Sequence, residues 1–220
     1  MVLSQSVEDY LKKIYKLESK SKGASTTQIA ESLDISSASA TNMLKRLARM
    51  GLVDYKSYKG ARLTESGQKI ALEIIRHHRL LELYLLEVLG YSWDEVHEEA
   101  ENLEHHISEQ FEDKIADLLN HPTHDPHGDP IPTKDGMMPE MKEQSLSQVE
   151  ERRPYIIVRV KDQEPEPLRY LEKEGLLPGA RLTVEEKAPL NGPLTLLIED
   201  KKKVIGRELA RTILVSRLSE

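Results

Sequence analysis

The spacing of the apolar residues changes once along this 220-residue chain. Up to about Asn120, apolar side chains recur every three or four residues, which is the period of an amphipathic helix. From Tyr155 onward the pattern is typical of short strands, with runs at residues 155–160, 181–184, 194–198 and 212–215 and one short helix at 168–176. The sequence therefore predicts a mainly α-helical chain that ends in a small β-barrel of the SH3-like type.

The first 75 residues show the element order of a winged helix-turn-helix domain. An amphipathic helix around residues 7–17 is followed by a short helix that begins at Ser25 and runs through Leu33. A third helix ends near Gly51, and two short strands then flank the basic turn 56–59. Helix, helix, turn, helix and hairpin is the order in which winged domains present a recognition helix to DNA.

Four segments follow from these patterns. We expect a winged helix-turn-helix domain at residues 1–74, a helical domain at 75–141, a linker at 142–152 and an SH3-like domain at 153–220. A long helix from about Glu65 to Leu89 leads out of the first domain, and further helices are expected up to Asn120. The stretch that follows, up to Met141, is rich in Pro, Gly and Asp, so we expect irregular structure there.

Charge is distributed unevenly along the chain. Residues 1–75 carry 12 Lys and Arg against 8 Asp and Glu, whereas residues 76–150 carry 5 against 18 and residues 151–220 carry 14 against 12. A basic first segment suits phosphate contacts, and an acidic middle segment attracts cations. The chain has no cysteine, which excludes disulfides and thiolate metal ligands. Because no apolar run approaches the ~20 residues of a membrane span, and no signal-peptide pattern is present, we expect a cytoplasmic protein without membrane contacts.

The second helix of the helix-turn-helix pair begins with small and hydroxyl-bearing residues. Such side chains permit close approach to the major groove, where hydroxyls bond to bases or phosphates and Asn42 is suited to pair with adenine. Basic side chains on the helix and on the wing fit phosphate contacts, which position a protein without specifying sequence. We expect contacts to double-stranded DNA from Ser36, Ser37, Ser39, Thr41, Asn42, Lys45 and Arg46 on the helix and from Lys56, Lys59 and Arg62 on the wing.

All eight histidines lie within residues 77–127. In the densest stretch, His97, Glu101, Glu104 and His105 fall at i, i+4, i+7 and i+8, so they share one face of a continuous helix. Imidazoles and carboxylates gathered in this way are typical ligands of a divalent metal ion. A solvated acidic helix face is the simpler alternative, but it does not account for the confinement of the histidines to this segment.

Four motifs occur in order along the chain: Val-Glu-Asp-Tyr at 7–10, Arg-His-His-Arg-Leu-Leu-Glu at 76–82, His-x-Glu-Ala-x-x-x-Glu-His at 97–105 and Pro-His-Gly-x-x-Ile-Pro at 126–132. Together they make the chain resemble the diphtheria-toxin-repressor family of metal-activated transcriptional repressors over essentially its whole length. The resemblance implies a DNA-binding head, a helical metal-binding and dimerisation domain, and an SH3-like, FeoA-like tail.

The resemblance also implies a primary metal site made by Asp9, Glu101, Glu104 and His105. Asp9 and Glu101 stand where iron-responsive members place methionine and cysteine, and oxygen at both positions favours Mn²⁺ over softer cations. This matches the manganese-responsive branch of the family. Fe²⁺ is the alternative, and Zn²⁺, Co²⁺ and Cd²⁺ are expected to bind the same ligands in vitro. Lys12 lies where that branch often places a second acidic residue, which argues against two closely spaced ions.

An ancillary metal site is implied at His78, Glu82 and His97. His78 and Glu82 stand at i and i+4 on one helix, which is a competent ligand spacing. The resemblance suggests Glu164 as a further ligand from the tail, with Asp125 and His127 at a position where related manganese regulators supply extra ligands. In some members of that branch the equivalent of His78 serves the primary site instead, and this alternative stays open.

These features predict a metal-activated repressor of metal-uptake genes. Because Asp9 is remote in sequence from its partner ligands, a metal ion would staple the DNA-binding head to the helical domain. This would set the spacing of two winged helices in a homodimer on a palindromic operator. An apolar stripe either forms the two-fold interface or belongs to the core, and it consists of Ile107, Phe111, Ile115, Leu118 and Leu119.

Two other interpretations of the function remain. One is an iron-responsive repressor of the same family, and the other is a winged-helix regulator that senses an organic ligand. An enzyme is not expected, because the stretch 97–101 lacks the second histidine of the His-Glu-x-x-His metallohydrolase motif and no nucleophile elbow or phosphate loop occurs. No protein partner other than a second copy is inferred.

Overall fold

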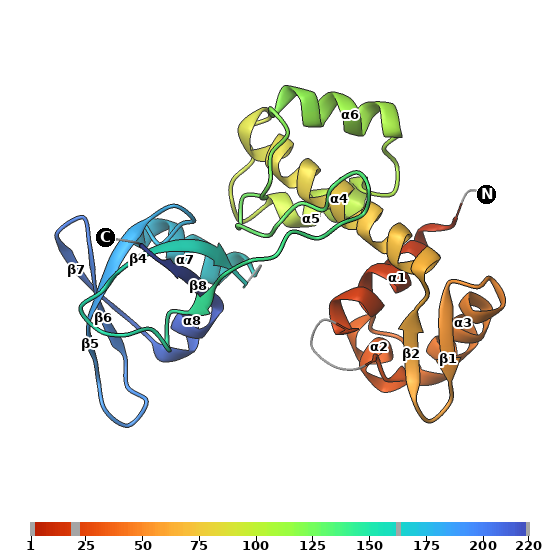
Figure 1. Ribbon diagram of the computed structural model, residues 1–220, viewed down its shortest axis with the longest axis horizontal. Helices are drawn as coiled ribbons and strands as arrows, with labels where there is room; N and C mark the ends of the chain where they lie inside the picture. Colours follow the sequence, from red (N-terminus) through yellow and green to blue (C-terminus); the bar gives the residue numbers. More distant parts are fainter. Residues whose placement is uncertain (1–2, 19–22, 162–163, 219–220) are drawn as a thin grey trace. The chain divides into compact units, whose positions relative to one another are not determined.

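The computed structural model describes residues 3–18, 23–161 and 164–218, and these form two compact units. The N-terminal unit comprises Met1–His77, Glu104–Ile107 and Pro132–Met138. The C-terminal unit comprises His78–Leu103, Ser108–Ile131 and Pro139–Glu220. The long helix α4 (Glu65–Glu87) contributes residues to both units (Figure 1). None of the helices in the described ranges is long and apolar enough to cross a lipid bilayer.

The N-terminal unit is a winged helix-turn-helix domain, as predicted. Its elements before α4 are α1 (Gln5–Glu18), α2 (Thr26–Ser32), α3 (Ser37–Arg49), β1 (Val53–Lys56) and β2 (Gly60–Leu63). Ser25 and Gln28 close a capping box at the start of α2, and the Ser36 hydroxyl accepts a hydrogen bond from the Ser39 amide at the start of α3. Apolar residues at helical spacing form the core, with Leu11, Ile14, Ile29, Leu44 and Leu47 completely buried.

The C-terminal unit combines helices with an antiparallel sheet. The helices are the remainder of α4, α5 (Val96–Leu103), α6 (Glu109–Leu118), α7 (Pro165–Glu174) and α8 (Arg207–Thr212). The strands β3 (Gln144–Ser145), β4 (Pro154–Val160), β5 (Arg181–Lys187), β6 (Leu194–Ile198), β7 (Lys201–Ile205) and β8 (Ile213–Arg217) form one sheet in the order β3-β8-β4-β5-β6-β7 (Figure 1). Alternate side chains of β6 are buried, which is the period expected for a strand with one face on a core.

Three features of this unit differ from the sequence-based expectation. The segment 142–152 is not a free linker, because it contributes β3 and buries Leu146 and Val149 in the core of the sheet domain. β7 was not predicted, since three of its five residues are lysines and the turn before it lacks Gly and Asn. In that turn Glu199 and Asp200 adopt positive φ angles of 47° and 62°, which glutamate rarely does, and the turn lacks the glycine that usually marks such a hairpin. α8 was also missed, because it is short and has no side-chain cap.

The helix of the histidine-rich stretch is shorter than predicted. α5 ends at Leu103, and residues 104–106 form a turn, so the four residues expected on one helical face do not share one. Within the N-terminal unit the backbone oxygen of Glu104 lies 3.2 Å from His77 Nδ1. The His77 ring thus provides the partner that a continuing helix would have given to this carbonyl group. The end of α5 therefore divides the stretch, and its two parts belong to different units.

Candidate metal centres and DNA-contacting surface

Three of the expected metal ligands lie together in the N-terminal unit. Asp9 is on α1, and Glu104 and His105 directly follow α5 in the sequence. His105 Nε2 is 2.9 Å from Asp9 Oδ1 and 3.2 Å from Glu104 Oε1. We call Asp9, Glu104 and His105 the α1 cluster. It brings one nitrogen and two carboxylate oxygens together from segments that are far apart in the sequence.

Glu8 orients the imidazole of the α1 cluster, and the sequence did not single it out. Its Oε2 lies 2.7 Å from His105 Nδ1, so the ring nitrogen that faces Asp9 and Glu104 is Nε2. Burial alone would lower the pKa of His105, but hydrogen bonds to Asp9, Glu104 and Glu8 outweigh it and raise the pKa to about 10. In metal centres, the ring nitrogen of a ligating histidine that does not face the ion often donates to a carboxylate, which fixes the orientation of the ring. The only sequence feature that indicates such a role for Glu8 is its position next to Asp9.

A cationic side chain also enters the α1 cluster. Lys12, on the same face of α1 as Asp9, places its Nζ 2.5 Å from Glu104 Oε1. Both side chains are buried, with exposed fractions of 5% and 0%. The sequence pointed to Lys12 as an obstacle to a second ion, but it did not predict an ion pair with a candidate ligand.

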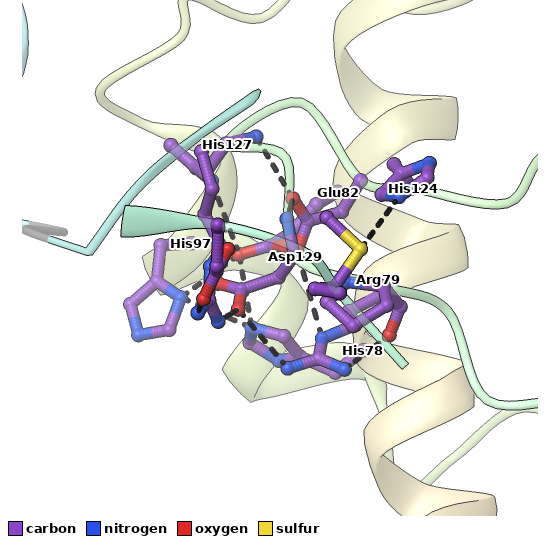
Figure 2. Close-up of polar contacts among 12 residues, drawn as sticks. His78, Arg79, Glu82, His97, His124, His127 and Asp129 are labelled. Carbon is purple, nitrogen blue, oxygen red and sulfur yellow. Dashed lines mark hydrogen bonds and ion pairs between the residues drawn. The ribbon is translucent and has the colours of Figure 1, made fainter. Parts of the chain in front are cut away.

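A second group of candidate ligands surrounds Glu82 in the C-terminal unit. Glu82 Oε1 is 2.9 Å from His78 Nε2 and 2.9 Å from His97 Nδ1, and these two nitrogens are 3.0 Å apart. His127 Nδ1 approaches the same oxygen at 3.9 Å, and Asp125 lies within the same group of ligand atoms. Figure 2 shows the labelled histidines with Glu82. We call His78, Glu82, His97, Asp125 and His127 the Glu82 cluster.

The most buried part of the Glu82 cluster has ligand atoms without hydrogen bonds, one of which, Asp125 Oδ2, lies 3.6 Å from Arg79 Nε. Within the described ranges, Glu82 Oε2, Asp125 Oδ2 and His127 Nδ1 are buried and have no hydrogen-bond partner. Buried polar groups are rarely left in this state. The other atoms of the same side chains are held: Asp125 Oδ1 accepts from the backbone amides of His127 (2.8 Å) and Asp129 (2.9 Å).

Burial and neighbouring charges shift the pKa values of this cluster in different directions. His127 Nε2 donates to the backbone oxygen of Trp93 (3.1 Å), which leaves the lone pair of Nδ1 facing the cluster. Burial lowers the pKa of His127, so its ring is held neutral. Burial would raise the pKa of Glu82, but the charge and hydrogen bond of His78 and the hydrogen bond of His97 keep it well below its usual range. Burial and the nearby charges of Glu82 and Asp129 raise the pKa of Asp125 well above its usual range.

The remaining predicted ligands lie elsewhere. Glu101 belongs to the C-terminal unit, where its Oε1 is 3.9 Å from His97 Nε2 and its carboxylate lies close to both His78 and His97. Glu164 is exposed at the N-cap of α7. Among the residues that the structure describes, the groups of close ligand atoms do not include Glu164. Its role as a ligand stays a prediction.

The sheet domain supports the loop that carries Asp125 and His127. The Val160 amide of β4 donates to the backbone oxygen of His127 (2.8 Å). Arg159 bonds to Asp129 (2.8 Å) and to Glu143, so it ties this loop to β4. The ring of Trp93 lies in the core of the sheet domain and packs on the His127 ring at a centroid distance of 5.2 Å. The positions of these two ligands therefore depend on the fold of the tail.

The predicted DNA contacts form an exposed surface of the N-terminal unit. Ser36, Ser37, Ser39, Asn42, Lys45 and Arg46 are exposed at the start and along one side of α3, whereas Thr41 is half-buried and its hydroxyl donates to the Ser37 backbone oxygen (2.8 Å). Lys56, Lys59 and Arg62 are exposed on the hairpin. The sequence did not point to Tyr58, which is fully exposed between the two lysines at the tip of the hairpin.

Comparisons with known proteins agree with this architecture. Residues 2–61 match the N-terminal DNA binding domain of iron dependent repressors, residues 64–133 their metal binding and dimerisation domain, and residues 144–217 the FeoA domain. The iron-dependent repressor IdeR of Mycobacterium tuberculosis is 32% identical over 229 residues, with 98% of this chain and 99% of the relative covered. The chain belongs to the iron-dependent repressor family.

The chain is also similar to manganese regulators. The HTH-type transcriptional regulator MntR of Oceanobacillus iheyensis is 37% identical over 116 residues, which cover 53% of this chain and 78% of the relative. A solved manganese-dependent transcriptional repressor in complex with manganese has a TM-score of 0.87 and 36% identity, with 96% of this chain and 100% of that chain covered. The predicted family, fold class and role as a metal-dependent, non-enzymatic DNA-binding regulator are confirmed.

The residues of this repressor fit a divalent metal ion. Both clusters offer only nitrogen and oxygen ligands, and in both a carboxylate and an imidazole nitrogen lie within a few ångströms of each other. The buried side chains of Glu82, Asp125 and His127 each offer a ligand atom within 4.8 Å of the others, and in the described part of the chain Glu82 Oε2, Asp125 Oδ2 and His127 Nδ1 have no hydrogen-bond partner. A cation is the ligand that satisfies two carboxylate oxygens and an imidazole lone pair at the same time.

We expect metal binding at the α1 cluster to release protons. His105 carries a proton at neutral pH because its pKa is about 10, and that proton must leave before Nε2 coordinates a metal ion. Below pH 10 the apparent affinity for the metal ion should therefore increase about tenfold for each unit by which the pH is raised, if one proton is released. Titration calorimetry in two buffers of different ionisation enthalpy measures the release directly. His106→Gln is the matched control, since His106 is exposed and should not change the proton count; identical heats in the two buffers would contradict the prediction.

Proposed function

We propose that this chain is a Mn²⁺-activated repressor that controls metal-uptake genes, with Fe²⁺ as the alternative cognate metal. The ligand chemistry supports this choice. The α1 cluster combines Asp9, Glu104 and His105, and the Glu82 cluster adds two further carboxylates without any sulfur ligand. Carboxylate-rich sites with imidazole suit Mn²⁺, whereas thiolate and thioether ligands suit softer ions.

The single observation that carries the proposal is the set of unpartnered atoms in the Glu82 cluster. Within the described residues, Glu82 Oε2, Asp125 Oδ2 and His127 Nδ1 are buried without hydrogen bonds. Arg79 Nε lies 3.6 Å from Asp125 Oδ2 and compensates part of the negative charge, but no hydrogen bond from the described residues satisfies any of the three atoms. Buried ligand atoms in this state favour a cation that coordinates them. A bound divalent cation supplies that positive charge and fixed coordination directions.

Control of DNA binding follows from the position of the α1 cluster. Asp9 lies on the first helix of the winged domain, and His105 and Glu104 come from a distant segment that packs in the same unit. Asp9 and His105 therefore hold α1 to the segment 104–107 when both coordinate one ion. This contact restricts the orientation of the recognition helix α3, which packs on the same core as α1. Coupling of this type is typically worth ~1–3 kcal/mol and is reciprocal, so operator DNA tightens metal binding by the same factor.

A homodimer on a palindromic operator is part of the proposal. The predicted apolar stripe is divided in the structure: Ile115 is buried, whereas Phe111 and Leu118 are 44% and 59% exposed. Val88 and Leu89, just after α4, are also exposed in the same unit. Large exposed apolar side chains on helices support a contact with a second copy. Two recognition helices in such a dimer would read half-sites about one helical turn apart.

The decisive experiment measures operator binding by chelator-stripped protein as each metal is added. An operator is first selected from random duplexes in the presence of Mn²⁺, and fluorescence anisotropy then follows binding with Mn²⁺, anaerobic Fe²⁺, Co²⁺ and Zn²⁺. We expect Mn²⁺ to tighten operator binding by about 10- to 100-fold, in line with the coupling energy. A shuffled duplex of the same length is the control for electrostatic binding.

Three outcomes would contradict the proposal in different ways. Operator binding that is equally tight with and without any divalent ion would exclude metal activation. Activation by Fe²⁺ alone at buffered, equal free concentrations would support the iron-responsive alternative. A chain that binds none of these ions would favour a regulator with an organic ligand.

A further inference from the structure

Lys12 is a buried lysine whose ammonium group reaches the ligands of the α1 cluster. It stands three residues after Asp9 on α1, so both side chains project from one side of the helix. Its side chain is 5% exposed, and its Nζ lies 2.5 Å from Glu104 Oε1. Lysine is almost never buried to this extent without a fixed partner. The ion pair with Glu104 is therefore what allows Lys12 to be buried in this cluster.

The oxygen that Lys12 contacts is the oxygen that faces the other ligands. Glu104 Oε1 is 3.2 Å from His105 Nε2, and the same nitrogen is 2.9 Å from Asp9 Oδ1. A cation held by these three residues needs an oxygen of Glu104 that already has an ammonium group beside it. Two positive charges at one buried carboxylate repel each other far more strongly than they would in water.

We infer that Lys12 is a permanent cation of the α1 cluster: it pairs with Glu104 when no metal ion is bound, and a divalent ion must take Glu104 from it. The inference rests on the proposed function in that the α1 cluster binds a divalent ion. Lys12 thereby weakens metal binding and raises the metal concentration at which the repressor responds. It determines the threshold of the sensor without being a ligand.

The first arm of the test measures the ion pair in the absence of metal. Full-length protein in a chelator is unfolded with urea as wild type, Lys12→Met, Glu104→Gln and the double variant. We expect Lys12→Met to lower the urea midpoint, and we expect at least half of this loss to disappear when Glu104 is already glutamine. Lys13→Met is the matched control, because it removes the same charge from the next position of α1.

The second arm measures Mn²⁺ affinity by competition with a chelator in a His127→Ala background, which removes one imidazole ligand from the Glu82 cluster. Lys12→Met should bind Mn²⁺ about tenfold more tightly or better than the background protein, because the competing charge is gone. Lys13→Met should stay within about threefold. Lys12→Gln keeps a hydrogen-bond donor beside Glu104 without the charge, and it should also bind more tightly; it carries the test if Lys12→Met does not fold.

The results separate this inference from the proposed function. If both Lys12 variants bind Mn²⁺ as tightly as the background protein or more weakly, the inference is overturned. Lys12 would then either have no effect on metal affinity or hold Glu104 in the position that favours metal binding. Absence of coupling between Lys12 and Glu104 in the urea cycle would overturn it as well. A wild-type chain that binds no divalent ion would instead overturn the proposed function, whatever the urea cycle shows.

Discussion

Replacing Asp9 with alanine is expected to abolish metal-dependent operator binding while the chain stays folded. Asp9 is the candidate ligand that α1 contributes to the α1 cluster, with its Oδ1 2.9 Å from His105 Nε2. Its side chain is one-third exposed, so alanine leaves no core cavity, and the buried His105 ring keeps Glu8 and Glu104 as partners. Loss of a directly coordinating carboxylate should weaken Mn²⁺ binding at this cluster by about 100-fold or more, since even supporting residues cost 10- to 100-fold.

The measurement is anisotropy of the selected operator as Mn²⁺ is added, together with the melting temperature of the protein with and without Mn²⁺. Glu31→Gln is a suitable control, because it removes an exposed carboxylate from α2. Any effect of losing this negative charge on DNA binding should be favourable, which is opposite to the effect expected for Asp9→Ala. An Asp9→Ala protein with the Mn²⁺ response of the wild type would show that the link between metal and DNA does not pass through the α1 cluster.

Substituting Gly128 by alanine should destabilise the C-terminal unit by about 3 kcal/mol or more and weaken metal binding at the Glu82 cluster. Gly128 has a φ angle of +87°, and a methyl group there would overlap the backbone oxygen of Val158 and lie 2.8 Å from Arg159 Cα. The loop and β4 must therefore separate, which breaks the hydrogen bond from the Val160 amide to His127. His127 then loses the support that holds Nδ1 toward Glu82.

Gly179→Ala separates the overlap from backbone strain. Gly179 lies in the same unit with a φ angle of +92°, but no atom lies within 4 Å of the added methyl group. It should cost only about 1–2 kcal/mol, the usual cost of a left-handed non-glycine residue. Urea unfolding gives the stability of both variants, and cation titration gives the metal affinity. Equal effects of the two substitutions would mean that the contact between the loop and β4 is not tight in solution.

Much of the fold could be predicted from local patterns. The heptad-like spacing of Val7, Leu11 and Ile14 and the cap at Ser25 identify helices that the structure confirms, and the lysine-rich turn between two short strands identifies the wing. These features depend on interactions within about four residues or across one tight turn, so sequence periodicity reports them directly. β7 was not predictable in this way, because its turn relies on Glu199 and Asp200 in a conformation that favours glycine or asparagine.

The candidate ligands were predictable as a set, but their grouping was not. A continuous helix would have placed His97, Glu101, Glu104 and His105 on one face. The end of α5 at Leu103 instead leaves Glu101 beside His97 and places Glu104 and His105 with α1. The carbonyl contact with His77 at this point comes from a residue of another helix, and no local pattern in the stretch encodes it.

The sequence by itself determined the residue types at both candidate centres, the residues expected to contact DNA on α3 and the wing, and the family to which the chain belongs. These depend on composition, spacing and motif order, which the chain carries without folding. Only the tertiary structure decided that Glu8 orients His105, that Lys12 pairs with Glu104 and that His127 faces Glu82 through Nδ1. Each of these is a contact between distant residues whose strength depends on burial, and burial exists only once the core has formed.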